Sequence, residues 1–209
     1  MSNPWLSIPF NEYEDHMRTN GQLQILNIIF KGTLENYTPK SLALLGCATG
    51  NGLEHVDSKV TDQVHAVDIN EDYLAMVKKR YGTCIPNLYI LKKDLGEDVL
   101  AIDPVNLVFA ALVLEYVRPE ILVPKIADVL QTGGKAVIVL QKSSMDSQTI
   151  TKTRYSSIRR LGQNLSEVSP QCIDRLFSQQ GFVKLAQERR VVNIDKLFII
   201  ICYEKTNIL

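Results

Sequence analysis

A glycine-containing loop and two later carboxylates are the residues of this sequence whose types and spacing point to a ligand. The loop is GCATGNG, residues 46–52, and its glycines let the backbone approach a ligand closely and adopt angles that side chains forbid. Asp68 follows 22 residues after Gly46, where a carboxylate can accept hydrogen bonds from the hydroxyls of a ribose. Asp94 ends a later apolar run in the same way, near where an adenine amino group would lie. Together these residues predict a site for a ligand that contains adenosine.

Five apolar runs must position these groups. They are the strands predicted at residues 41–46, 63–68, 87–94, 106–114 and 135–141. Because the runs alternate with helical patterns, they predict an α/β fold with a doubly wound, mostly parallel sheet and helices on both faces. Ligands bind to such sheets beyond the carboxyl ends of the strands, where the loop, Asp68 and Asp94 are all predicted to lie.

Helices are predicted where apolar residues recur at helical spacing or where capping residues occur. They are expected at residues 22–36, 50–58 and 70–80, from Arg118 to the QTGG turn at 131–134, and from Ser169 to Gly181. Gly133 suits the left-handed position that ends the fourth of these helices. Two final strands, at 182–188 and 196–204, are joined by a connection too short for a crossover, so they must pair antiparallel.

Composition excludes several classes of protein. Lys+Arg and Asp+Glu number 23 each in a chain of 209 residues, so no global charge attracts nucleic acid or an anionic membrane. No apolar run approaches the roughly 20 residues of a membrane helix, and the N-terminus has no signal-peptide pattern. The scattered Cys47, Cys84, Cys172 and Cys202 lack metal-ligand spacing. We therefore predict a cytoplasmic protein without a metal site.

Five motifs in order resemble those of class I S-adenosylmethionine-dependent methyltransferases. They are GCATGNG, VDIN (67–70), KKDL (92–95), FAALVLEYV (109–117) and LQTGGKAVIVLQ (130–141). The resemblance covers about residues 41–141, roughly half of the chain. It implies a seven-stranded sheet in the order 3-2-1-4-5-7-6, with the last strand antiparallel. We expect one domain over 1–209: an N-terminal helical cap (1–38), a cofactor-binding core (39–141) and an acceptor-side segment with the final strands (142–209).

The resemblance also implies S-adenosylmethionine as cofactor, S-adenosylhomocysteine as product and a set of contacts. Backbone at Gly46, Cys47, Ala48 and Gly50 would line the methionine part, Asp68 would hold the ribose, Ile69, Asp94 and Leu95 would address the adenine, and Ala110, Ala111 and Leu112 would flank the methionine end. Two residues depart from the family pattern. Leu44 replaces an acidic residue, so other groups must supply the contacts of the amine. Ala48 replaces a glycine, a change that should be tolerated if the φ of residue 48 is negative.

Catalytic candidates are few, because alignment of the reacting atoms supplies most of the effect in methyl transfer. His16 lies in the polar-aromatic stretch NEYEDHM, and Tyr13, Glu14, His16 and Met17 could form a lid; a solvated helix start is the alternative. Glu115 and Tyr116 follow the fourth strand, beside the expected position of the methyl group; either they contact the cofactor or substrate, or they only flank the next helix. Catalytic roles are therefore predicted for His16, Tyr13 and Glu115.

The segment 143–164 lacks clear periodicity and should be functional, mobile or partly helical. Between 147 and 166 it contains Lys152, Arg154, Arg159 and Arg160 and no carboxylate. It is either a solvated basic helix face or a wall of the acceptor pocket that could attract an acidic or phosphate-bearing substrate.

We thus predict a methyltransferase that acts on a small molecule. Two alternatives remain: a non-catalytic domain of the same fold that binds the cofactor or its product, and an NAD-dependent oxidoreductase. The second fits the loop less well, since GxGxxG from Gly46 would place Ala48 second and Asn51 third.

Overall fold

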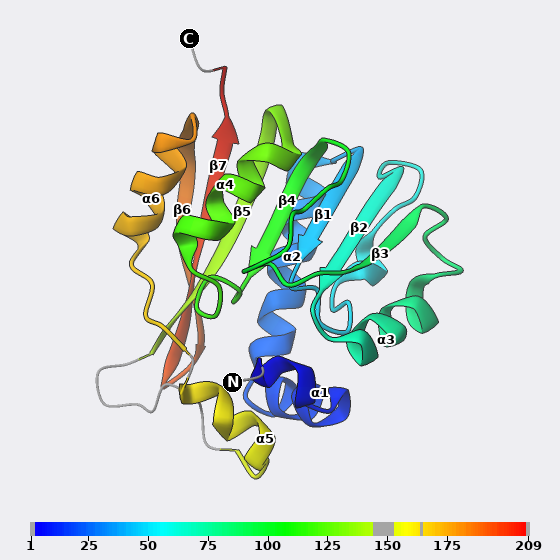
Figure 1. The fold of residues 1–209 in the computed structure, drawn as a ribbon, viewed down its shortest axis with the longest axis vertical. Helices are drawn as coiled ribbons and strands as arrows, with labels where there is room; N and C mark the ends of the chain where they lie inside the picture. The colour runs from blue at the N-terminus through cyan, green and yellow to red at the C-terminus, as the bar shows by residue number, and fades with distance from the viewer. Residues whose placement is uncertain (1–2, 144–152, 164, 208–209) are drawn as a thin grey trace.

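The computed structural model describes residues 3–143, 153–163 and 165–207 (Figure 1). Within these residues the strands form one seven-stranded sheet in the order β3-β2-β1-β4-β5-β7-β6. The strands are β1 (Ser41–Leu45), β2 (Gln63–Asp68), β3 (Leu88–Lys92), β4 (Val105–Ala111), β5 (Leu130–Ser143), β6 (Phe182–Asn193) and β7 (Lys196–Lys205). The first five pair parallel, and β7 runs antiparallel to both β5 and β6. The predicted fold class and strand order are confirmed.

In the part of the chain that the structure describes, four α-helices cover the two faces of the sheet, and two more lie at one end of it. The covering helices are α2 (Gln22–Tyr37), α3 (Glu71–Tyr81), α4 (Pro119–Val129) and α6 (Pro170–Gln179), and the other two are α1 (Phe10–Thr19) and α5 (Ser156–Arg159). Successive side chains of a strand point to opposite faces, so Ala43 and Leu45 pack into the core on the α4 and α6 side. Leu42 and Leu44 pack into the core on the α2 and α3 side.

The helix starts that were predicted from capping residues are confirmed. The Asn70 side chain accepts hydrogen bonds from the backbone of Asp72 (3.0 Å) and Tyr73 (3.2 Å) at the start of α3. Ser169 accepts one from Cys172 N (3.1 Å) at the start of α6. These bonds satisfy backbone N–H groups that have no partner inside a helix.

The helix predicted at residues 50–58 is wrong. Only a 3-10 turn, Leu53–His55, forms there. Gly50 (φ 83°) and Gly52 (φ 96°) adopt left-handed conformations that interrupt an α-helix before it can begin. The Asn51 side chain also donates to Leu23 O (2.9 Å), which ties this loop to α2.

Gly133 was predicted to end the helix from Arg118, and this is also wrong. Helix α4 ends at Val129, because Leu130 is already extended (φ −90°, ψ 131°). Gly133 is left-handed (φ 78°), but it lies within β5, where the register with β4 shifts between Val105 and Leu107. The glycine therefore shapes an irregular strand start.

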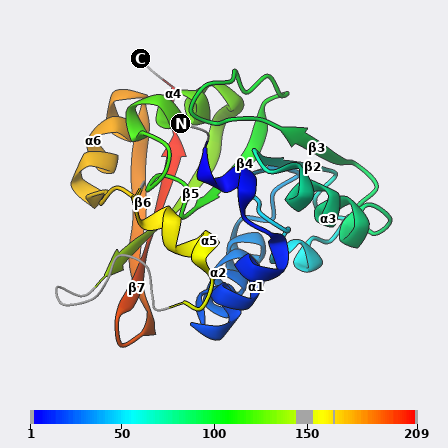
Figure 2. The same cartoon turned by 60° about the horizontal axis from the view of Figure 1, so that its bottom comes forward.

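The N-terminal segment, α1 and α5 gather at the carboxyl ends of the parallel strands (Figures 1 and 2). The segment begins with a 3-10 helix, Pro4–Ser7, and a second such turn, Arg160–Gln163, follows α5. The irregular segment 143–164 is thus partly helical in its described part; its residues 144–152 and 164 lie outside the described residues. Among the described helices none is long and apolar enough to cross a membrane.

Candidate functional site

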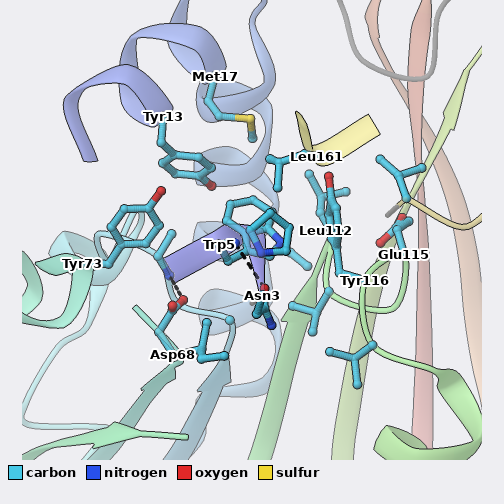
Figure 3. Close-up of a pocket in the computed structure, with 18 of the residues that line it drawn as sticks. Asn3, Trp5, Tyr13, Met17, Asp68, Tyr73, Leu112, Glu115, Tyr116 and Leu161 are labelled. Carbon is cyan, nitrogen blue, oxygen red and sulfur yellow. Dashed lines mark hydrogen bonds between the residues drawn. The ribbon is translucent and has the colours of Figure 1, made fainter. Parts of the chain in front are cut away.

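A cavity of about 610 Å³ opens where the predicted ligand site was expected, at the carboxyl ends of β1, β2 and β4 (Figure 3). Its size lies within the roughly 300–1,000 Å³ of sites that bind small organic ligands. Eight of the residues implied as cofactor contacts line it: Gly46, Ala48, Asp68, Ile69, Asp94, Leu95, Ala111 and Leu112. Cys47, Gly50 and Ala110 are not among the lining residues. Cys47 and Ala110 are buried in the cores on either side of the sheet, and Gly50 faces Tyr81 and Leu53.

The loop after β1 brings backbone to the cavity, with Ala48 in a conformation that differs from the expected one. The φ of Ala48 is 45°, so the condition of a negative φ is not met. A left-handed alanine costs about 1–2 kcal/mol. The cost is offset because Ala48 N donates to the Asp68 carboxylate at 2.8 Å, and Cys47 N donates to Val67 O at 3.0 Å.

Asp68 joins the loop to the start of α3. Its Oδ2 accepts the bond from Ala48 N, and its Oδ1 accepts one from Asn70 N at 2.9 Å. Burial raises the pKa of Asp68 overall, and the hydrogen bonds from the backbone N–H groups around it oppose part of that rise. A carboxylate has about four acceptor positions. Asp68 can therefore keep these two bonds and accept others from ligand hydroxyls in the cavity.

Leu44, which replaces an acidic residue of the family pattern, is not among the residues that line the cavity. Leu44 is 5% exposed and packs in the core on the α2 and α3 side, away from the cavity. Gln22 at the start of α2, buried and in the cavity wall, is one polar group on that side of the loop.

Leu112 after β4 adopts φ 56° and donates its N–H to Val139 O at 2.9 Å, which places it in the wall.

Aromatic residues form the wall opposite the sheet, and two of them, Trp5 and Tyr73, were not predicted as site residues. Trp5 packs edge-to-face against Tyr116, with ring centroids 4.9 Å apart. It also packs edge-to-face against Tyr13, with ring centroids 6.0 Å apart. Tyr73 lies 5.4 Å from Tyr13 (Figure 3). The Asn70 side chain donates to Trp5 O at 2.7 Å and holds this segment over the site. No local pattern marks Trp5, because its partners lie far away in the sequence.

The predicted lid residues divide into two roles. Tyr13, His16 and Met17 line the cavity, whereas Glu14 fastens α1 to the loop after β1. Glu14 accepts a hydrogen bond from Thr49 Oγ1 at 2.6 Å and a bidentate ion pair from Arg80. Burial alone would raise the pKa of Glu14, but the bonds from Arg80 and Thr49 lower it overall.

Replacing Glu14 with glutamine should loosen α1 and weaken binding of an adenosine ligand by about 5-fold, since a partly exposed ion pair contributes up to ~1 kcal/mol. Isothermal titration of S-adenosylhomocysteine measures the change. Glu35→Gln is the matched control, because Glu35 pairs with Lys31 on the surface of α2. Equal affinities of the two variants would show that the Glu14 contacts do not hold the lid.

Burial decides how the three catalytic candidates can act. It raises the pKa of Tyr13, which keeps its hydroxyl proton at neutral pH. It lowers the pKa of His16 to about 4, so the ring is neutral, and Asn20 Nδ2 lies 3.2 Å from its Nε2. It raises the pKa of Glu115 to about 7, near the range in which a general base is most effective.

Glu115, in the turn after β4, belongs to a polar group that also includes residues of β5 and β7. Its Oε1 accepts a hydrogen bond from Gln141 N at 2.6 Å. Lys196, at the start of β7, donates to Gln141 Oε1 at 3.0 Å, and all three residues line the cavity. Gln141 and Lys196 were missed because Gln141 reaches Glu115 through the pairing of β5 with β4, and Lys196 reaches Gln141 through the pairing of β5 with β7.

The basic segment is only partly a wall of the cavity. Arg160 lines it, while Arg154 pairs with Asp15 at 3.1 Å near α1, and Arg159 is exposed. Lys152 lies outside the described residues. Within the part of the chain that the structure describes, no group of three or more His, Cys, Asp or Glu could hold a metal ion.

Comparisons with known proteins agree with this geometry. Residues 44–134 match the model of the family described as "Methyltransferase domain". No curated protein matches the sequence. The resemblance that the sequence motifs indicated is confirmed.

Several solved structures have the same fold. The [4+2]-cyclase SpnF superposes with a TM-score of 0.67 at 12% identity, over 88% of this chain and 82% of that one. Geranyl diphosphate C-methyltransferase from Streptomyces coelicolor A3(2) superposes with a TM-score of 0.65 at 12% identity, over 84% of this chain and 76% of that one. The N-methyltransferase NodS from Bradyrhizobium japonicum WM9, in complex with S-adenosylhomocysteine, gives 0.60 at 16% identity, over 96% and 90%.

Proposed function

Because residues 44–134 match the model of the methyltransferase domain family, we propose that the protein transfers the methyl group of S-adenosylmethionine to a small molecule. One observation carries the proposal above the others. Asp68 is fixed by the backbone of Ala48 and Asn70 at the edge of the cavity. The cavity continues into an aromatic compartment, which is lined by Trp5, Tyr13 and Tyr116. Such a site has a place for an adenosine and, next to it, room for a second molecule.

The residues of the cavity suit the cofactor. Asp68 would accept hydrogen bonds from the ribose hydroxyls, and Ile69, Asp94 and Leu95 would surround the adenine. Backbone at Gly46 and Ala48, with Ala111 and Leu112, would hold the methionine end. The bound cofactor supplies an activated methyl group on a sulfonium, so the protein has to align the acceptor and exclude water.

Similar structures favour a small acceptor and also keep one alternative open. Geranyl diphosphate C-methyltransferase and NodS are methyltransferases, and the first acts on a small molecule named in its description. SpnF, in contrast, is described as a [4+2]-cyclase on the same fold. The second candidate function is therefore a domain that binds S-adenosylmethionine or S-adenosylhomocysteine without transferring the methyl group.

Binding and transfer can be measured separately. Isothermal titration of the purified protein with S-adenosylmethionine, S-adenosylhomocysteine and NAD tests the cofactor; the first two should bind and NAD should not. Incubation with methyl-labelled S-adenosylmethionine and a metabolite extract then tests transfer, which should label a small molecule. Binding without any labelled product would favour the second candidate, and binding of NAD alone would overturn both.

A further inference from the structure

The aromatic compartment of the cavity has one polar end, at Glu115. This side chain is 2% exposed, and among the described residues its Oε2 has no hydrogen-bond partner. Glu115 and Asp68 lie on opposite sides of the cavity in Figure 3. A buried carboxyl oxygen without a partner costs free energy, which a ligand that donates a hydrogen bond would recover.

The groups around Glu115 set the charge of this polar end. Lys196 from β7 is 4% exposed and acts on Glu115 electrostatically, and it also lies near His16 of α1. Tyr116 is adjacent, and burial keeps its hydroxyl protonated by raising its pKa. Asp195 acts on Lys196, and Arg160 lines the same cavity. A Glu115 carboxylate and a Lys196 ammonium together carry no net charge.

The rest of the compartment is apolar. Trp5 and Tyr116 meet edge-to-face, and Ile158, Leu161 and Leu165 line the side formed by α5 and the turn after it. Ile158 and Leu161 are 1% and 4% exposed. Such walls favour a flat apolar body, because burying apolar area is favourable and aromatic pairs gain further from edge-to-face contacts.

We infer that the methyl acceptor is a neutral, flat, apolar molecule with a phenol-type hydroxyl, which donates to Glu115 Oε2 and loses its proton to it. This inference rests on the proposed function. In the step, a lone pair of the acceptor oxygen forms a bond to the methyl carbon. The bond between that carbon and the sulfonium breaks, its electron pair stays on sulfur, and the hydroxyl proton passes to the Glu115 carboxylate.

A hydroxyl fits better than a charged amine. A neutral acceptor leaves the combined charge of the buried Glu115 and Lys196 at zero, whereas an ammonium would give this apolar compartment a net positive charge. An ammonium would also lie close to the positive charge of Lys196. An acceptor oxygen develops negative charge as its proton leaves, which Lys196 stabilises.

The test uses the protein saturated with S-adenosylhomocysteine. Para-substituted phenols, the matching benzenes without the hydroxyl and the matching benzylamines are titrated as probes. We expect phenols to bind at least 10-fold more tightly than either matched set. With S-adenosylmethionine instead, the most tightly bound phenol should give its methyl ether.

Two variants separate the roles of Glu115 and Lys196. Glu115→Gln should keep the affinity for S-adenosylhomocysteine within about 2-fold but lower the rate of ether formation by about 10²–10⁴-fold, the usual contribution of a general base. It should also abolish the fall in rate below about pH 7. The Lys196 charge lowers the pKa of Glu115, so Lys196→Met should move that fall to higher pH. Glu115→Asp should restore part of the rate.

Several outcomes would overturn the inference. They are phenols that bind no better than the matching benzenes, benzylamines that bind or react in preference, no methyl ether from the wild-type protein, and a Glu115→Gln variant with wild-type rates. If any of these outcomes is found while S-adenosylhomocysteine still binds, it contradicts this inference but not the proposed cofactor site. Absence of that binding in the wild-type protein would overturn the proposed function and this inference together.

Discussion

Replacing Asp68 with alanine should raise the dissociation constant of S-adenosylhomocysteine by about 10- to 150-fold, because hydrogen bonds to a charged group contribute roughly 1.5–3 kcal/mol. The carboxylate lies at the end of β2, is 9% exposed and lines the cavity. Its loss would remove the acceptor that we propose for the ribose hydroxyls, and it leaves Ala48 N without its 2.8 Å bond. Isothermal titration of the wild-type and variant proteins measures the effect.

Two further variants show which property of Asp68 matters. Asp68→Asn keeps the shape and one acceptor oxygen, so its dissociation constant should fall between those of the alanine variant and the wild type. Asp57→Ala is the matched control, because Asp57 also accepts a backbone N–H, from Lys59 at 2.9 Å, on an exposed loop. An Asp68→Ala variant that binds as tightly as Asp57→Ala would remove Asp68 from the cofactor site.

The second large effect is expected at Gly46, where β1 enters the loop. Its φ is 66°, and a Cβ added there would lie 2.4 Å from Val113 Cγ2, a side chain in the cavity wall. Gly46→Ala must displace Val113 or shift the loop. We expect it to raise the dissociation constant of S-adenosylhomocysteine on the order of 10-fold or more, the equivalent of losing one good hydrogen bond.

The Gly133→Ala variant distinguishes the cost of a left-handed backbone from the cost of steric overlap with Val113 at residue 46. Gly133 is also left-handed (φ 78°), but a Cβ added there meets no atom within 4 Å. Both variants should lose about 1–2 kcal/mol of unfolding free energy from the left-handed conformation, measured by urea denaturation. Gly46→Ala should lose more and should also bind less tightly. Equal stabilities and unchanged binding in both would mean that neither Val113 nor the cavity constrains residue 46.

Much of the fold could be predicted from local patterns. Five apolar runs alternating with helical spacing indicate a doubly wound sheet, and Asn70 and Ser169 mark helix starts because their side chains replace missing backbone partners. Asp68 and Asp94 could be assigned to one site because the carboxyl ends of parallel strands meet at one edge. This reasoning needs only the strand ends.

Backbone conformation in the loop could not be read in the same way. Alanine at residue 48 is left-handed because Asp68, 20 residues away, holds its N–H. The helix expected at residues 50–58 fails because two left-handed glycines and the contact of Asn51 with α2 outweigh helical spacing. Tertiary hydrogen bonds exceed the small free-energy preferences that local patterns report.

By itself, then, the sequence determined which segments form strands and that Asp68 and Asp94 lie at the ends of two of them, because periodicity and capping act over a few residues. The order of the strands in the sheet was implied only by the resemblance to the methyltransferase family. Only the tertiary structure decided what surrounds the acceptor. Trp5 meets Tyr116, and Glu115 meets Gln141 and Lys196, across separations that no local pattern spans. Trp5 lies over the site because Asn70 holds the N-terminal segment there, and Gln141 and Lys196 lie near Glu115 because β5 pairs with both β4 and β7. Burial there changes the pKa values of Glu115 and Lys196.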